Sequence, residues 1–328
     1  MQTPIFRSEV FKVTVFLVTT MILGALLAPP LFLSCKWLVA QGTLEDGPLD
    51  ALNAALERSK FSRFFNRAML IAAILMIYPT VRWVRAGLND SQRFRSDISL
   101  VKNPYRWKHI ALGFVLALVP LLLMGWVYVK VGYYKPRSAD DWEWSRVLIK
   151  AMSAAAGAAI VEELFFRWGL MNLILRAARP FRALLFVTFV YTLVHFMKPP
   201  PELQLPPVIW SSGFWMIGQI FSQFGNPIFV MAEFATLFTV GWILGYVRLK
   251  TRSLWMGIGL HAGWIFGIKI FSPITRKKMA LADMLPWAGQ DLKTGIIPMA
   301  VVLLTGIMVW LILRKYYTRS AFASESHD

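Results

Sequence analysis

The sequence predicts an all-α polytopic membrane protein with about eight transmembrane helices and a polar site inside the helix bundle. Of its 328 residues, 57% are apolar and the mean hydropathy is +0.53, whereas soluble chains are about 45 to 50% apolar even with Gly counted. Only 16% are Asp, Glu, Lys or Arg, against roughly 25% in soluble proteins. Eight apolar segments also approach the length of roughly 20 residues that a membrane-spanning helix needs.

The eight segments are expected to be separate helices. The first follows Arg7 and Lys12, but it is longer than a signal-peptide core and no clean cleavage site follows, so an uncleaved helix is predicted. The fourth is longer than one crossing requires. In chain order the segments cover residues 13–33, 68–84, 110–131, 147–175, 183–197, 228–247, 254–271 and 296–313.

A proline-rich stretch interrupts the chain after the fifth segment. Five prolines lie between residues 199 and 207, and a shorter apolar run follows at 208–224. A full crossing by this run would reverse every later helix and place the basic residues 248–252 outside. The sequence therefore predicts a re-entrant or interfacial segment on the outer side.

The net charge of +17 comes from 35 Lys and Arg against 18 Asp and Glu. No polar basic domain carries these cations, so no nucleic-acid partner is predicted. They concentrate instead in alternate loops, above all at 82–108 and just after the fourth, sixth and last segments. Because cytoplasmic loops are rich in Lys and Arg, both termini are predicted to be cytoplasmic, with the lipid bilayer as a partner.

Ionisable groups inside a bilayer are costly, so they default to functional or pairing roles. Each of four such residues lies 9 to 15 positions from the basic residue at the predicted cytoplasmic end of its own segment, or roughly 13 to 23 Å along a helix. This shared depth would allow the four side chains to meet in one layer. They are Glu162, His195, Glu233 and His261.

A second acid, Glu163, adjoins Glu162 in the fourth segment. Glu163 and Arg167 stand at positions i and i+4, the favourable order for an ion pair within a helix. Glu162 is rotated by about 100° and is left free of that arginine. The free acid suits a general base acting on water, and two histidines could complete a proton-handling and oxyanion-stabilising set.

These residues resemble the motifs of a known family. Glu162, Glu163 and Arg167 match E-E-x-x-x-R, residues 191–195 match F-x-x-x-H, and His261 matches the start of H-x-x-x-N. The sequence is similar to the CPBP group of CAAX-protease and bacteriocin-processing (Abi-type) intramembrane peptidases. The resemblance covers residues 147–271 as a catalytic core.

The rest of the chain carries no motif of this group. Residues 1–140 are expected to hold only N-terminal helices and loops. Residues 272–328 are expected to hold an outside loop, the last helix and a cytoplasmic tail, within one membrane domain overall. The patterns around Leu244 and Ser253 look typical of bacterial members, which implies a bacterial inner membrane.

The resemblance implies a glutamic-type intramembrane endopeptidase without a cofactor. Its substrate would be a membrane-bound or lipid-anchored protein or peptide. Glu162 and His195 would activate the attacking water, Glu163 would belong to the same catalytic set, and His261 would stabilise the oxyanion. Arg167, Tyr191 and Glu233 would support the site.

Two positions depart from the family pattern. Tyr191 replaces Phe, which adds a hydroxyl near His195, and Ile265 replaces the Asn four residues after His261. Loss of an oxyanion donor can cost about 10² to 10³ in rate. Either another group substitutes, or the protein is slow or inactive.

Three alternatives stay open beside the peptidase. Two histidines and a carboxylate can hold zinc with an open position for water, although no H-E-x-x-H motif occurs. The protein could instead be an inactive membrane scaffold or immunity-type protein, which the substitution at Ile265 favours. A proton-coupled transporter would also need buried acids and histidines, but no internal repeat supports it.

Overall fold

The computed structural model describes residues 9–42, 50–86, 100–138, 142–197, 205–225, 227–289 and 291–324. The chain forms two compact units. The first consists of residues 1–93 and 196–225, and the second of residues 94–195 and 226–328. This division differs from the predicted boundaries near residues 140 and 271, which stay predictions because the division concerns packing and not function.

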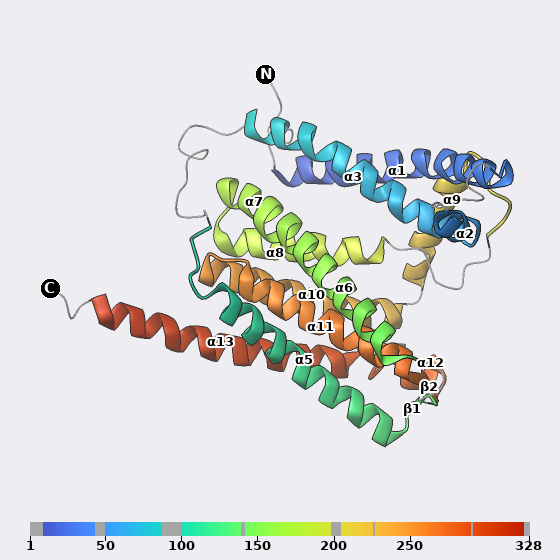
Figure 1. Ribbon diagram of the computed structural model, residues 1–328. Helices are drawn as coiled ribbons and strands as arrows, with labels where there is room; N and C mark the ends of the chain where they lie inside the picture. Colours follow the sequence, from blue (N-terminus) through green and yellow to red (C-terminus); the bar gives the residue numbers. More distant parts are fainter. Residues whose placement is uncertain are drawn as a thin grey trace. The chain divides into compact units, whose positions relative to one another are not determined.

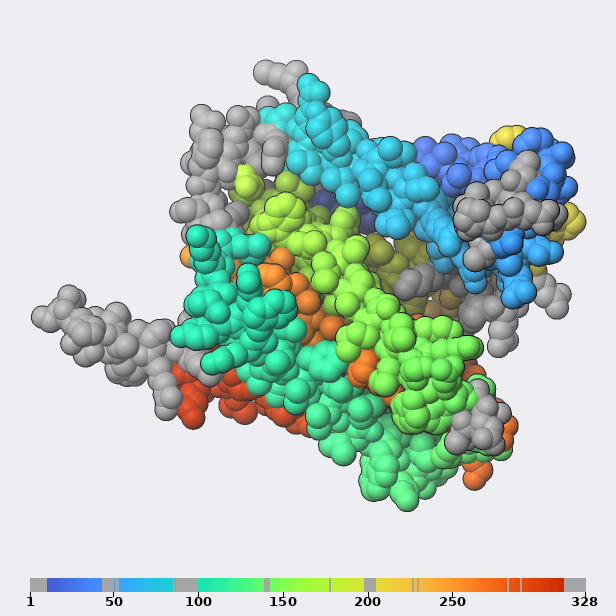
Figure 2. Space-filling view, viewed as in Figure 1, coloured from blue at the N-terminus to red at the C-terminus, as the bar shows by residue number. Residues whose placement is uncertain are grey.

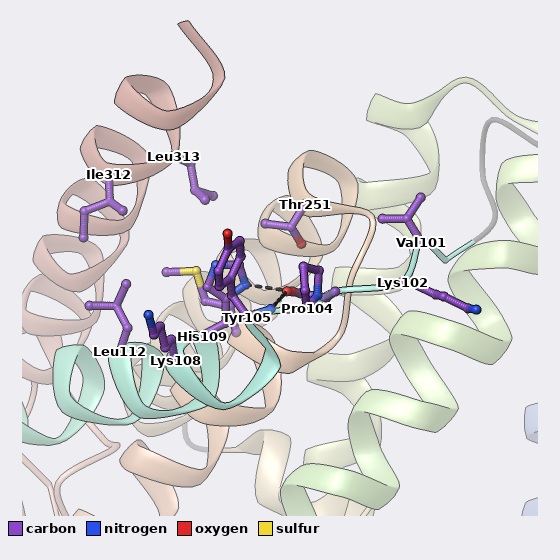
Figure 3. A pocket seen from close by; sticks show the side chains of 12 residues that line it. Val101, Lys102, Pro104, Tyr105, Lys108, His109, Leu112, Thr251, Ile312 and Leu313 are labelled. Atoms are coloured by element: carbon purple, nitrogen blue, oxygen red, sulfur yellow. Dashed lines mark hydrogen bonds between the residues drawn. The ribbon is translucent and has the colours of Figure 1, made fainter. Parts of the chain in front are cut away.

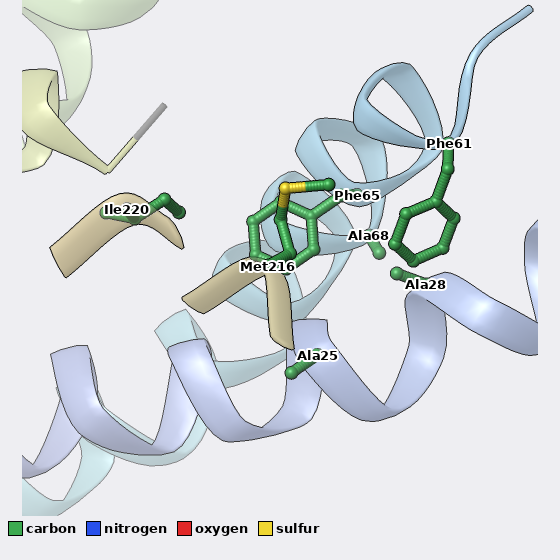
Figure 4. Close-up of a cluster of buried hydrophobic side chains, with 7 residues drawn as sticks. All are labelled: Ala25, Ala28, Phe61, Phe65, Ala68, Met216 and Ile220. Carbon is green, nitrogen blue, oxygen red and sulfur yellow. The ribbon is translucent and has the colours of Figure 1, made fainter. Parts of the chain in front are cut away.

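The first unit is a small helical assembly. Its elements are α1 (Glu9–Ala40), α2 (Asp50–Glu57), α3 (Phe61–Ala86), α9 (Ser212–Ser222) and the 3₁₀ turn η5 (Gln223–Gly225). Helices α1 and α3 pack along each other, and α9 packs on α1. Figure 4 shows the apolar side chains that meet between them, namely Ala25, Ala28, Phe61, Phe65, Ala68, Met216 and Ile220.

Close contact between α9 and α1 depends on a glycine. A Cβ atom on Gly213 would lie 1.9 Å from the carbonyl oxygen of Ala25, so only a residue without a side chain fits there. Small residues at helix interfaces allow backbones to approach in this way. At 11 residues, α9 is about 16 Å long and too short to cross a bilayer.

The second unit holds the remaining helices (Figure 1). They are α5 (Arg106–Val131), α6 (Trp144–Glu162), the π-helix η4 (Glu163–Leu170), α7 (Met171–Ala177), α8 (Pro180–Phe196), α10 (Pro227–Thr251), α11 (Trp255–Ile274), α12 (Leu281–Met284) and α13 (Ile296–Ser324). The last residue of α8, Phe196, is counted with the first unit. Strands β1 (Tyr134–Pro136) and β2 (Thr275–Lys277) form an antiparallel pair.

Helix α11 is the centre of this unit, because α5, α6 and α10 all pack on it. Its glycines let α5 approach closely. A Cβ atom on Gly259 would lie 2.2 Å from the carbonyl oxygen of Ile110, and one on Gly263 would lie 2.5 Å from that of Phe114. Helix α13 packs beside α5 on the same face of the unit, as Figure 2 shows.

Helix α5 ends because Gly132 adopts a left-handed backbone conformation with φ of 91°, which L side chains rarely adopt. The outward side of α5 carries large apolar side chains that are between 44% and 64% exposed. Such a continuous exposed apolar surface is typical of a helix that faces lipid. The residues are Val115, Val119, Leu123, Trp126, Val127 and Val131.

Six helices in the described ranges are long and apolar enough to cross a membrane. They cover Phe11–Ala40, Phe61–Val84, Arg106–Val131, Val230–Thr251, Trp255–Ile274 and Ile296–Lys315. These helices confirm the all-α polytopic membrane class, and the chain is an integral membrane protein. The predicted number of eight crossings is not confirmed.

The two remaining predicted crossings fall short for different reasons. Segment 147–175 is divided among α6, η4 and α7, and it contains the charged residues Glu162, Glu163 and Arg167. Segment 183–197 lies in the shorter apolar helix Pro180–Phe196. Two stretches used in the prediction, the basic loop around residues 87–99 and the prolines at 199–201, lie outside the described residues.

Candidate functional site

The two adjacent glutamates lie at the point where α6 changes into a π-helix. Glu162 is the last residue of α6, and Glu163 is the first residue of the eight-residue η4. A π-helix has i→i+5 hydrogen bonds and often occurs at functional sites. The sequence predicted an uninterrupted helix here, since nothing in its apolar periodicity marks the widened turn.

The predicted ion pair between Glu163 and Arg167 is present. Its closest atoms, Glu163 Oε1 and Arg167 Nη1, are 3.3 Å apart, and both side chains are at most 1% exposed. Arg167 also donates through Nη2 to the carbonyl oxygen of Gly241 at 3.3 Å, and its Cζ lies 4.4 Å from the centre of the Tyr191 ring. Its Nε and Nη1 atoms have no hydrogen-bond partner in the described part of the chain, so the buried charge is held by the ion pair, the Gly241 carbonyl and the Tyr191 ring.

Glu163 also holds His261. Its Oε1 atom is 3.1 Å from His261 Nδ1, at hydrogen-bond distance, so the ionised carboxylate orients that imidazole. Gly257, one turn before His261 on α11, leaves the space that the carboxylate occupies, because a Cβ atom there would lie 2.9 Å from Glu163 Oε2. The other ring nitrogen, Nε2, faces Glu162 at 3.5 Å from Oε2.

His195 completes the cluster from α8. Its Nε2 atom is 3.6 Å from Glu162 Oε2. Its Nδ1 atom is 2.8 Å from the carbonyl oxygen of Tyr191. A carbonyl only accepts, so Nδ1 carries the proton and Nε2 of the neutral ring is an acceptor. The structure therefore brings Glu162 between the Nε2 atoms of two histidines.

This convergence has a chemical consequence. With both imidazoles neutral and their Nδ1 atoms protonated, three acceptors surround one point, and Glu162 Oε2 is buried without a hydrogen-bond partner. A molecule with two donors, such as water, matches this arrangement. The exposed fraction of the side chain is 27% for Glu162 and 17% for His195, against 5% for His261 and 1% for Glu163. The cluster is therefore open on the side of Glu162 and His195.

Aromatic rings form one wall of the cluster. The ring centre of Tyr191 lies 4.4 Å from that of His195 and 6.2 Å from that of His261. Phe166 contacts Tyr191 edge to face at 5.2 Å between ring centres. Tyr191 thus contacts Arg167 and both histidines.

Glu233 forms its ion pair away from the cluster around Glu162. Its carboxylate binds the ammonium of Lys293, and Asp291 lies 3.9 Å from the same ammonium. Burial opposes a charge on Lys293, but Asp291 and Glu233 more than offset this and raise its pKa. Glu233 has the predicted depth, but it connects α10 to the segment before α13.

Sequence reasoning missed three contributors to the site. Gly257 makes room for Glu163, and the Gly241 carbonyl holds Arg167. The Nε1 atom of Trp264, next to Ile265, is buried and has no hydrogen-bond partner. Only Gly257 had a readable signal, because it lies four residues before His261 and so shares its face of the helix.

Among the described residues, no group of three or more His, Cys, Asp and Glu is arranged as a metal site.

Comparison with known families identifies this part of the chain. Residues 144–267 match the family described as type II CAAX prenyl endopeptidase Rce1-like. The match confirms the resemblance to the CPBP group and indicates a CAAX-type intramembrane protease fold for this segment, which contains all four clustered residues. No curated protein and no solved structure matches the chain.

Proposed function

We propose that this protein is a glutamic-type intramembrane endopeptidase that hydrolyses a peptide bond in a membrane-bound or lipid-anchored protein or peptide. The observation that carries the proposal is the position of Glu162, whose Oε2 atom lies within 3.6 Å of both His195 and His261. A free carboxylate between two imidazoles, inside a segment with this family match, suits the activation of water.

The reaction begins with proton transfer from water to Glu162, assisted by His195. The hydroxide adds to the scissile carbonyl carbon and generates an oxyanion. The C–N bond then breaks as the amine nitrogen takes up the proton, which leaves a carboxylic acid and an amine that exchange a proton to become a carboxylate and an ammonium. Proton transfer by a positioned side chain typically contributes about 10² to 10⁴ in rate.

In this scheme His261 stabilises the oxyanion. Glu163 orients the His261 ring, because Glu163 Oε1 lies 3.1 Å from His261 Nδ1. The proton that Glu162 takes from water passes to His261 Nε2, which lies 3.5 Å from Glu162 Oε2, and the Nε2–H group then donates to the developing negative charge before the proton moves on to the amine. Glu163 acts through His261 and is a positioning residue in this scheme.

The missing Asn at position 265 requires another donor. Trp264 is a candidate, because its buried indole N–H is unpaired and lies about 60° around α11 from His261. A buried donor without a partner costs roughly 1 to 3 kcal/mol, and a substrate oxygen would relieve that cost. Trp264→Phe should then slow cleavage without loss of folded protein, whereas an unchanged rate would remove Trp264 from the site.

The charge pattern supports a topology with both termini in the cytoplasm, and the resemblance to bacterial members around Leu244 and Ser253 supports a bacterial inner membrane. A substrate that is itself in the membrane reaches the cluster by lateral diffusion. The open side at Glu162 and His195 is where its peptide bond would enter.

Accumulation of the uncleaved precursor tests the proposal. Cells that carry Glu162→Gln should retain a precursor that copurifies with the protein and is identified by mass spectrometry. Glu143→Gln is the matched control, because Glu143 is an exposed acid directly before the same helix and, among the described residues, it pairs with its neighbours Ser145 and Arg146. A precursor that is cleaved at the wild-type rate by the Glu162→Gln protein would refute the peptidase.

A second candidate is an inactive membrane scaffold or immunity-type protein. Ile265 at the family's Asn position favours it. The two functions differ in one result: an unchanged cellular phenotype with Glu162→Ala, at normal protein abundance, supports the scaffold.

A further inference from the structure

The second unit contains a cavity of about 560 Å³ that the proposed catalysis does not use (Figure 3). Its walls come from the loop before α5, the first turns of α5, the end of α10, the start of α11 and the end of the apolar part of α13. This volume lies within the range of about 300 to 1,000 Å³ that is typical of small-molecule sites.

The cavity lies where three membrane-spanning helices end. The apolar span of α5 begins at Arg106, that of α10 ends at Thr251, and that of α13 ends at Lys315. Thr251 lines the cavity itself, and so do Lys108 on α5 and Leu313 on α13. The cavity is therefore at the level of lipid headgroups on one side of the membrane.

The lining combines cations with apolar surface. Leu112, Ile312 and Leu313 form an apolar wall between α5 and α13, and Lys108 lies on the same side of the cavity in Figure 3. Lys102 lines the opposite side, and its long side chain extends away from the apolar wall in Figure 3, so it would turn toward a bound anion. No Asp or Glu is among the described residues of the lining. Positive charge beside an apolar groove complements an anionic amphiphile.

Hydrogen bonds hold the loop that forms the polar wall. The Asn103 amide donates to Ser253 Oγ at 3.1 Å and lies 2.7 Å from His109 Nδ1. The backbone N–H of Val101 donates to the carbonyl oxygen of Arg252 at 3.0 Å. These bonds connect the loop to α5 and to the turn between α10 and α11, so the wall is in place before a ligand binds.

The cavity is separate from the proposed catalytic cluster. Met256 lines the cavity, whereas His261 lies five residues later, about 140° around α11. None of Glu162, Glu163, His195 and His261 lines the cavity. A ligand in the cavity would contact α11 from the side that faces α5.

We propose that this cavity is a binding site for an anionic phospholipid. The phosphate of the headgroup lies between Lys108 and Lys102. One acyl chain runs along the groove formed by Leu112, Ile312 and Leu313, toward the interior of the bilayer. The bound lipid seals α13 against α5 at the membrane surface.

Native mass spectrometry of the purified full-length chain tests this site. The protein is titrated with dioleoyl phosphatidylglycerol and, in parallel, with dioleoyl phosphatidylcholine. The tightest phosphatidylglycerol site should weaken about 30-fold in the double variant Lys102→Gln/Lys108→Gln, because each cation near the surface is worth about fivefold. The double variant Lys135→Gln/Lys277→Gln changes the net charge equally on the exposed β1 and β2 strands and should bind as the wild type does.

Two further measurements distinguish binding of the lipid from binding of a free anion. Ile312→Trp fills the apolar groove without a change in charge and should remove one bound phosphatidylglycerol, with thermal stability as the check on folding. Inorganic phosphate in large excess should not displace the lipid. Equal affinity for both lipids, equal loss in the two double variants, or displacement by phosphate alone would each overturn the proposal.

Discussion

The two units of the molecule differ in their buried charged side chains: the first buries Lys12 beside the ring of Trp83, whereas the second buries charged side chains that contact one another. In the first, the cluster between α1, α3 and α9 consists only of apolar residues (Figure 4). In the second, Glu163, Arg167 and His261 are at most 4% exposed, although all three can carry charge. Both units contain apolar helices, so membrane insertion alone does not explain the difference.

The comparison shows what each interior requires. Apolar side chains need only a complementary shape, which many combinations of residues satisfy. Buried charges each need a specific partner, and here Glu163 has Arg167 on its own helix and His261 on another. The cost of such an arrangement is a reason to expect the chemistry in the second unit.

The largest effect is expected for Glu163→Gln. It leaves the Arg167 guanidinium buried without its carboxylate, and breaking a buried pair typically costs about 3 to 5 kcal/mol of unfolding free energy. Glu162→Gln breaks no such pair and should unfold close to the wild type. Thermal unfolding of the two purified variants in the same detergent tests whether Glu163→Gln is the less stable. Equal melting temperatures would contradict the prediction.

A steric change in the first unit should act on stability alone. Gly213→Ala places a Cβ atom 1.9 Å from the carbonyl oxygen of Ala25, and overpacking of this kind costs about 1 to 3 kcal/mol. Gly218→Ala is the control on the same helix, because a Cβ atom there meets nothing within 4 Å. Cleavage per folded molecule should be unchanged in both. A catalytic defect in folded Gly213→Ala protein would show that the first unit contributes to the reaction.

A smaller steric change in the second unit should act on activity. Gly257→Ala pushes against Glu163 Oε2, whose carboxylate orients His261. We expect a roughly tenfold fall in kcat with little change in Tm, because small misplacements of catalytic groups are costly. Gly157→Ala, which meets nothing within 4 Å on α6, should cleave normally. Equal rates for the two variants would remove the positioning role of Gly257.

The smallest effect concerns the Glu233–Lys293 pair. The carboxylates of Asp291 and Glu233 raise the pKa of Lys293 in the folded protein. The pair therefore stabilises the fold fully below the ordinary pKa of 10.5, and this stabilisation is lost as the pH rises through the higher pKa of the folded state. The ammonium is partly exposed, so we expect only a few tenths of a kcal/mol.

Thermal stability measured below and above the pKa of Lys293 tests the predicted direction of the pH dependence. The wild type should lose more stability than Lys293→Met as the pH rises. Tyr134, whose pKa burial raises further above 10, contributes equally to both proteins. Parallel pH curves for the two proteins would contradict the role of this pair.

Much of the site could be predicted from the sequence. Equal depth along separate apolar helices placed Glu162, His195 and His261 in one layer, and i to i+4 spacing paired Glu163 with Arg167. The argument worked because charged groups in lipid have few ways to be satisfied. Depth along the helices could not distinguish Glu233 from the other three residues. The partner of Glu233 is Lys293, which lies in a loop, and depth along a helix gives no information about loop residues.

The fold was less predictable at its irregular points. The sequence predicts one long helix over residues 147–175, whereas the chain passes through the π-helix η4 at Glu163. The switch from α-helix to π-helix depends on local hydrogen bonding, which the pattern of apolar residues does not indicate. The contact of Glu163 with His261 also depends on how α11 is rotated against η4, which a single sequence does not reveal.

A double-mutant cycle on the cleavage rate tests the central claim that Glu162 and His261 serve one reaction centre. With the precursor that copurifies with the Glu162→Gln protein as substrate, Glu162→Gln, His261→Asn and the double variant are compared with the wild type. Residues that act as a unit give a double variant about as slow as the slower single variant. Multiplied effects, or full activity in either single variant, would contradict a shared hydrolytic site.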